Sequence, residues 1–154
     1  MHSLQEMRIG FKKNHGFTMI EVIAVLVIIG VISAFLLFRA SSTESYRLIS
    51  EVGTLKGHLR YAQLRAMSDT VSWGTAYTSS SYTLQKNGAM APSNLPNEDS
   101  ATHAFQSGVS ITSGASMVSF DEWGSPGGSD ISITLSAGTD SRTITVTKNT
   151  GFIP

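Results

Sequence analysis

The sequence predicts an α+β fold in which one long N-terminal helix packs on an antiparallel, β-rich C-terminal lobe. Three observations lead to this prediction. Residues 17–38 form an almost uncharged apolar run, residues 39–69 carry an apolar stripe with helical spacing, and after Thr70 the composition changes to Ser, Thr, Gly and β-branched residues. With 154 residues, the chain has room for one domain besides a membrane segment.

The apolar run is long enough to cross a bilayer. A helix over residues 17–38 would measure about 33 Å, and Glu21 is its one charged residue. Arg8, Lys12 and Lys13 precede it, so the positive-inside rule predicts a cytoplasmic N-terminus and a C-terminal lobe across the membrane. A removed secretory signal is the alternative, but its apolar core would be shorter, about 7 to 15 residues, and would end at a small-residue cleavage site.

The second helical segment, residues 39–69, is predicted to bury one face. Its stripe recurs at alternating steps of four and three and consists of Leu48, Val52, Leu55, Leu59, Ala62 and Ala66. The charged residues of the segment are predicted to form a solvated face: Glu44, Arg47, Glu51, Lys56, Arg60 and Arg65. Gly53 and Gly57 lie outside the apolar run, so their spacing indicates packing or a bend and not a transmembrane dimer motif.

The remainder of the chain, residues 70–154, is predicted to form strands. They are expected at 71–78, 82–86, 109–112, 117–120, 131–135 and 143–147. The pair Asn87-Gly88 predicts a turn after the second of these strands, and residues 137–140 predict a hairpin between the last two. Residues 91–100, with two prolines and adjacent acids, are predicted to form an exposed loop.

The sequence offers little for catalysis. The absence of Cys excludes disulfides, Cys-based metal sites and Cys nucleophiles. His58 and His103 are predicted to be surface residues, and no nucleophile elbow or phosphate-binding glycine loop occurs. We therefore predict no enzyme activity and no cofactor. Without residues 1–16 the chain carries 8 basic and 10 acidic residues, a net charge of about −2, which makes nucleic acid an unlikely partner.

One acidic loop is a candidate for metal binding. Asp121, Glu122 and Asp130 flank a glycine-rich stretch, and carboxylates on such a loop are ligands that Ca²⁺ prefers. The spacing is not that of an EF-hand. The favoured alternative is a turn with a packed Trp123 and solvated acids, and no metal site is predicted.

The segment around residue 16 is the most specific motif of the chain. A basic leader, Gly16, Phe17 and then Glu21 at the fifth position of the apolar run resemble the processing signal of type IV prepilins and type II secretion pseudopilins. The resemblance implies cleavage of residues 1–16 by prepilin peptidase, N-methylation of Phe17, and pairing of Glu21 with the amine of a neighbouring subunit. An ammonium and a carboxylate attract strongly in a medium of low dielectric constant, which supports such a pair. Alternatively, Glu21 merely snorkels to the interface or becomes neutral.

The C-terminal lobe is similar to the GspH/FimT group of minor pilins. The similar stretches are 118–120, the glycines at 127–128, 131–135, 142–146, 151–153 and the helical 59–67. FimT-like pilins implicated in DNA uptake tend to carry basic residues near the C-terminus. Here only Arg142 and Lys148 are close to it.

The resemblance implies a minor pseudopilin in the periplasmic pseudopilus of a type II secretion system. Residues 17–38 would anchor it in the bacterial inner membrane by a single pass and later pack in the filament core, while residues 39–69 continue the helix and 70–154 form the periplasmic lobe. The expected partners are prepilin peptidase, major and other minor pseudopilins or pilins, and the inner-membrane assembly platform. Two alternatives stay open: a FimT-like minor pilin of a type IV pilus, serving assembly, adhesion or DNA uptake, and a non-assembling membrane-anchored binding module.

Overall fold

The computed structural model describes residues 17–154, and the side chains of all of these except 36–42. Gly16 and the rest of the expected leader lie outside the described residues. The chain divides between Phe38 and Arg39 into two units, each of which is described by itself.

A single helix, α1 (Met19–Asp69), contributes to both units and confirms the predicted helix. In the first unit the described apolar side chains are exposed, for example Met19 at 84% and Leu26 at 64%. Within the part of the chain that the structure describes, no helix combines the length and the hydropathy needed to cross a bilayer. The single-pass span expected over residues 17–38 is therefore not confirmed.

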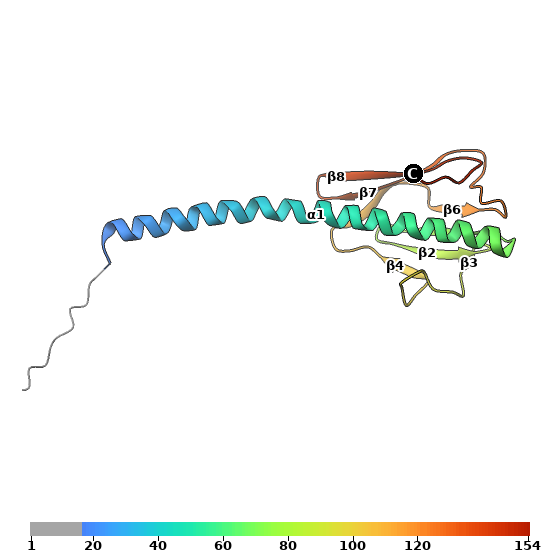
Figure 1. Cartoon of the computed structure of the whole chain (residues 1–154), viewed down its shortest axis with the longest axis horizontal. Helices are drawn as coiled ribbons and strands as arrows, with labels where there is room; N and C mark the ends of the chain where they lie inside the picture. The colour runs from blue at the N-terminus through green and yellow to red at the C-terminus, as the bar shows by residue number, and fades with distance from the viewer. Residues whose placement is uncertain (1–16) are drawn as a thin grey trace, which may run out of the picture. The chain divides into compact units, whose positions relative to one another are not determined.

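The second unit contains two antiparallel sheets, and Figure 1 shows the C-terminal half of α1 running along them. The first sheet has the order β3-β2-β1-β6, with β4 paired to β2, and the second has the order β5-β7-β8. The strands are β1 (Trp73–Tyr77), β2 (Ser81–Lys86), β3 (Ala89–Met90), β4 (Thr102–Ala104), β5 (Val109–Gly114), β6 (Met117–Phe120), β7 (Ile131–Ala137) and β8 (Asp140–Val146).

The core lies between the helix and the two sheets. Five residues of the predicted helical stripe are at most 1% exposed: Leu48, Leu55, Leu59, Ala62 and Ala66. Because alternate strand residues point to the same face, Ile133 and Leu135 of β7 are buried while Thr134 between them is only half-buried. Each large apolar side chain buried in this way contributes roughly 1.5–3 kcal/mol.

All six predicted strands are present, with ends that differ by a few residues. The hairpin predicted at 137–140 joins β7 to β8, with Ala137 paired to Asp140. β3 and β4 were not predicted, because two and three residues are too few to show an alternating pattern.

The exposed loop predicted at 91–100 is wrong in part. Leu95, the one large apolar residue in it, is 2% exposed, and Ala91 is 5% exposed. The backbone N–H of Leu95 donates to the Ser100 carbonyl at 2.9 Å, so the segment folds back and buries its apolar side chain. The prolines and acidic residues correctly predicted a loop, but they gave no sign that Leu95 within it is buried.

The helix glycines neither break α1 nor pack closely within the chain. α1 continues through Gly53 and Gly57, and a Cβ at either position would meet no atom within 4 Å. Gly74 is different, because a Cβ there would overlap the carbonyl oxygen of Val118 on the neighbouring strand β6. Close pairing of β1 and β6 therefore requires glycine at position 74.

Candidate functional site

The start of α1 carries the residues of the N-terminal motif and is closed by a capping box. The hydroxyl of Thr18 accepts the backbone N–H of Glu21 at 3.3 Å, and the Glu21 carboxylate accepts the backbone N–H of Thr18 at 3.4 Å. Two donors at the helix start are thereby satisfied reciprocally. The sequence signal for the box, Thr-x-x-Glu, is present at 18–21, although Glu21 was expected in subunit assembly or at the membrane interface and not in a helix cap.

The electrostatics of this helix end favour a negative charge. Glu21 lies in the first turn, where the helix dipole is positive. Phe17 directly before the cap is 82% exposed. The structure thus brings Thr18 and Glu21 together at an accessible helix end, with Phe17 next to them in the chain.

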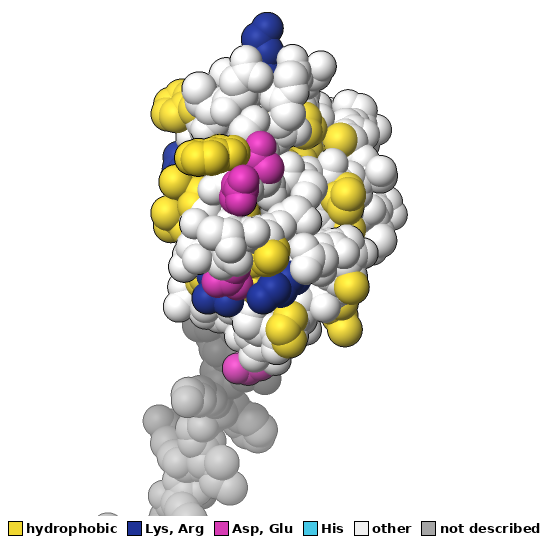
Figure 2. Space-filling model, turned by 90° about the vertical axis from the view of Figure 1, so that its right-hand side faces the viewer, with side chains coloured by type: hydrophobic (Ala, Val, Ile, Leu, Met, Phe, Trp, Pro, Cys, Tyr) yellow, Lys and Arg dark blue, Asp and Glu magenta, His cyan; other side chains and the backbone are white. Residues whose placement is uncertain are grey.

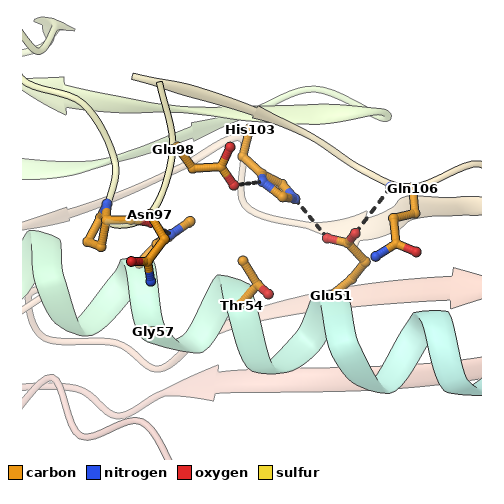
Figure 3. A pocket seen from close by; sticks show the side chains of 9 residues that line it. Glu51, Thr54, Gly57, Asn97, Glu98, His103 and Gln106 are labelled. Carbon is orange, nitrogen blue, oxygen red and sulfur yellow. Dashed lines mark hydrogen bonds and ion pairs between the residues drawn. The ribbon is translucent and has the colours of Figure 1, made fainter. Parts of the chain in front are cut away.

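A second group of polar residues surrounds a cavity of about 370 Å³ in the second unit, shown in Figure 3. The lining residues come from α1, from the segment after β3, and from β4 and the residues that follow it. They are Glu51, Thr54, Gly57, His58, Pro96, Asn97, Glu98, His103 and Gln106.

His103 lies between two carboxylates at this cavity (Figure 3). Its Nε2 is 2.8 Å from Glu51 Oε2, and its Nδ1 is 2.6 Å from Glu98 Oε1. Burial by itself lowers the pKa of His103, but the hydrogen bonds and charges of Glu51 and Glu98 outweigh burial and raise the pKa above 6.5. Since both ring nitrogens face acceptors, the arrangement fits a doubly protonated, positively charged imidazole.

His58 has the opposite environment. Its Nε2 is 3.0 Å from the Pro96 carbonyl oxygen, so this nitrogen carries the proton, and its Nδ1 accepts the Tyr82 hydroxyl at 2.7 Å. Burial and the neighbouring positive charge of His103 lower the pKa of His58. Burial also raises the pKa of Tyr82, which keeps its hydroxyl protonated as a donor. His58 is therefore a neutral histidine, and its ring centroid lies 5.9 Å from that of the charged His103.

These positions correct the sequence predictions. His58 is 5% exposed and Glu51 is 2% exposed, so neither is the solvated residue that was expected. The side chain of His103, also predicted at the surface, is 13% exposed. Glu51 and His58 are seven residues apart and flank the apolar stripe on one side of α1, where the segment around Pro96 and β4 cover them. The buried face of the helix is thus wider than its apolar stripe.

The acidic loop has structural hydrogen bonds. Asp121 Oδ1 accepts the backbone N–H groups of Trp123 and Ser125 at 2.9 and 2.8 Å, and Asp130 Oδ1 accepts that of Lys148 at 2.8 Å. Glu122 is exposed. Across residues 17–154, no group of three or more His, Asp or Glu side chains is placed to hold a metal ion.

The packed Trp123 expected in that loop is wrong, because its side chain is 79% exposed. Gly124 lies against the helix instead: a Cβ there would sit 2.9 Å from the sulfur of Met67, and the Gly124 carbonyl accepts the side-chain amide of Gln63 at 2.9 Å. Hydrogen bonds to Asp121 close the turn in this arrangement, which leaves the indole outside.

The surface at the C-terminal end of α1 has mixed character. Figure 2 shows apolar side chains dispersed among uncharged ones, with basic and acidic groups side by side. No broad basic surface is visible on the face drawn.

Comparisons with known proteins agree with these observations. Residues 11–37 match the protein family described as the prokaryotic N-terminal methylation motif. No curated protein matches the chain.

Two crystal structures of the type IV minor pilin FimU from Pseudomonas aeruginosa (strain PAO1) are similar in fold. The structure in space group P21 has a TM-score of 0.53 at 15% identity and covers 73% of this chain and 90% of FimU. The structure in space group P65 has a TM-score of 0.50 at 13% identity and covers 70% of this chain and 90% of FimU. The chain therefore combines a prokaryotic N-terminal methylation motif with an α+β fold similar to that of the type IV minor pilin FimU.

Proposed function

We propose that the chain is a minor structural subunit of a pilin-type filament and has no catalytic role. The match of residues 11–37 to the methylation motif, on a chain with a pilin fold, carries the proposal. In this proposal prepilin peptidase removes residues 1–16 after Gly16, and Phe17 is N-methylated. Residues 17–38 anchor the subunit in the inner membrane and later pack in the filament core, whereas residues 39–69 and 70–154 lie in the periplasm.

The geometry around Glu21 supports its proposed role at the join between subunits. Among the described residues 17–154, the hydrogen bond that its carboxylate accepts is a long one, 3.4 Å from the backbone N–H of Thr18. A carboxylate can accept several hydrogen bonds, and a charged ammonium is a stronger donor than a backbone amide. The methylated amine of Phe17 from a neighbouring subunit would supply such a donor, and the pair would set the register of assembly.

Two hosts fit this role. The pseudopilus of a type II secretion system is our first choice, because the β-lobe is similar to the GspH/FimT group in the pattern of residues 118–153. A type IV pilus is the second, and the observation that favours it is the structural likeness to FimU, which is a type IV minor pilin.

The role of Glu21 is tested with Glu21→Ala, using Glu122→Ala as a matched control at an exposed acid in the lobe. The measurement is the amount of each variant in sheared or purified filaments, with mass spectrometry of the N-terminus. We expect a methylated Phe17 in wild type, loss of Glu21→Ala from the filaments, and normal incorporation of Glu122→Ala. Incorporation of Glu21→Ala at the wild-type level would contradict the proposal.

The host is tested by crosslinking. The chain has no Cys, so the thiol of a Ser33→Cys variant would be unique. Capture of pseudopilins in native cells would place the subunit in secretion, and capture of pilus subunits would place it in a type IV pilus. Failure to capture any pilin-like helix would favour a solitary membrane-anchored module.

A further inference from the structure

The segment 91–101, which we call the strap, covers the side of α1 that bears Glu51 and His58. Hydrogen bonds to β2 fix both of its ends: Ala91 N–H donates to the Leu84 carbonyl at 2.9 Å, and the Ala101 carbonyl accepts Leu84 N–H at 2.8 Å. Between these ends the strap has two connections to side chains of α1. The Pro96 carbonyl bonds His58 of the helix directly, and Glu98 bonds His103 of β4, which in turn bonds Glu51 of the helix. Histidines therefore mediate both connections.

We propose that the strap is a pH-sensitive closure, in which His103 links Glu98 to Glu51 while both ring nitrogens are protonated, and in which loss of one proton releases Glu98 and opens the strap. A neutral imidazole has a single N–H and can donate to one carboxylate only. The other carboxylate would then face a nitrogen lone pair at hydrogen-bond distance, which is repulsive.

The structure indicates which carboxylate is released. The side chain of Glu51 is 2% exposed, and its second oxygen also accepts the backbone N–H of Gln106 at 3.2 Å. The side chain of Glu98 is 31% exposed and can turn into water. An unpaired buried carboxylate is far more costly than a hydrated one, so the remaining proton stays on Nε2 toward Glu51. Deprotonation therefore frees Glu98, whereas Glu51 keeps its bond to His103 and Pro96 keeps its bond to His58.

The other titratable groups near His103 support this direction. Within the described residues, α1 contributes Glu51 and His58, β2 contributes Tyr82, and the strap contributes Glu98. Burial lowers the pKa of His58 and raises the pKa of Tyr82, so both side chains stay neutral. The two carboxylates are thus the charges that decide the protonation of His103, and both favour the charged form.

Opening of the strap would change the surface of the lobe. Leu95, now 2% exposed, would become accessible together with the cavity of about 370 Å³ that Glu98 lines. The pH of the surroundings would then control whether an apolar surface is available to a partner.

The test is amide hydrogen exchange of the full-length chain in detergent micelles from about pH 5 to about pH 9, corrected for the intrinsic effect of pH on exchange. NMR of the His103 imidazole reports its protonation in the same samples. Because one proton is lost on opening, we expect protection of the Leu95 and Glu98 amides to fall by up to about tenfold per pH unit between the pKa of His103 in the open strap and its higher pKa in the closed strap, and to level off above the latter. Protection of amides in β7 and β8 should not change.

Glu98→Gln provides the decisive variant, and Asp99→Asn is its matched control at an exposed acid of the same strap. The amide introduced by Glu98→Gln can donate to the neutral Nδ1 of His103, so strap protection in this variant should no longer depend on pH. Asp99→Asn should behave as wild type. The proposal is overturned if His103 keeps one protonation state throughout, if it loses its proton without a change in strap protection, or if Glu98→Gln retains the wild-type pH dependence.

Discussion

Leu59 is 0% exposed in the stripe of α1 that packs on the sheets, and we expect Leu59→Ala to destabilise the second unit by about 3–5 kcal/mol. The substitution removes three carbon atoms from the core. At about 0.8 kcal/mol per buried methylene, the transfer free energy lost is roughly 2.5 kcal/mol. The cavity left by the side chain adds roughly 0.5–2.5 kcal/mol, because surrounding atoms relax only in part.

The assay is urea denaturation of the full-length chain in mild detergent, followed by tryptophan fluorescence. Trp73 is 1% exposed and should change its emission on unfolding, whereas Trp123 is 79% exposed and should change little. Leu64→Ala on the same helix is the control, since Leu64 is 64% exposed and its loss should cost less than about 0.5 kcal/mol. Equal costs for the two substitutions would refute the assignment of the buried face.

Three further predictions concern glycines, the helix cap and pH. Gly57→Ala should stabilise the protein by about 0.5–1 kcal/mol, because alanine favours the helix and its Cβ has space there. Gly74→Ala should destabilise the protein by about 1–3 kcal/mol, because its Cβ meets the Val118 carbonyl. Thermal unfolding in which Gly74→Ala is more stable than Gly57→Ala would contradict both predictions. Thr18→Ala should weaken the first turn of α1 by about 0.5–2 kcal/mol, seen as faster amide exchange there; unchanged rates would show that the cap is dispensable. Because burial lowers the pKa of His58, the unfolded chain binds protons more readily, so the free energy of unfolding should fall as pH drops below about 6.5. Urea titrations of His58→Gln should lack this part of the pH dependence.

The apolar face of α1 and the strands could be predicted from the sequence, because both depend on local periodicity. Leu55 and Leu59 follow the helical repeat, and the alternating residues of β7 and β8 flank a short turn. In such segments the spacing of apolar residues within a short window predicts which side chains are buried, and no knowledge of distant contacts is needed.

The histidine–carboxylate cluster could not be predicted in the same way. Glu51 and His103 are 52 residues apart in the chain, and a polar residue on a helix is assigned to solvent unless its partner is known. The partner lies on β4, a strand of three residues without a periodic signal. Burial of Glu51 is therefore a consequence of tertiary contacts only.

Two other differences have local causes. Trp123 was expected to be packed in a turn, but the hydrogen bonds of Asp121 close the turn so that Gly124 faces the helix. Thr18 could have been predicted as a helix cap from the spacing alone. Its role was missed because Glu21, its partner in the box, had been assigned to subunit assembly.

The order of the elements along the chain has a consequence for biosynthesis. α1 is translated before the strands, whereas Ile144, Val146 and Ile153, which complete the core, are translated at least 75 residues after the end of the helix. At about 5–20 residues per second, the apolar face of the helix remains uncovered for several seconds or longer. During this interval the nascent chain presents a surface to which chaperones, or another unfinished copy, can bind.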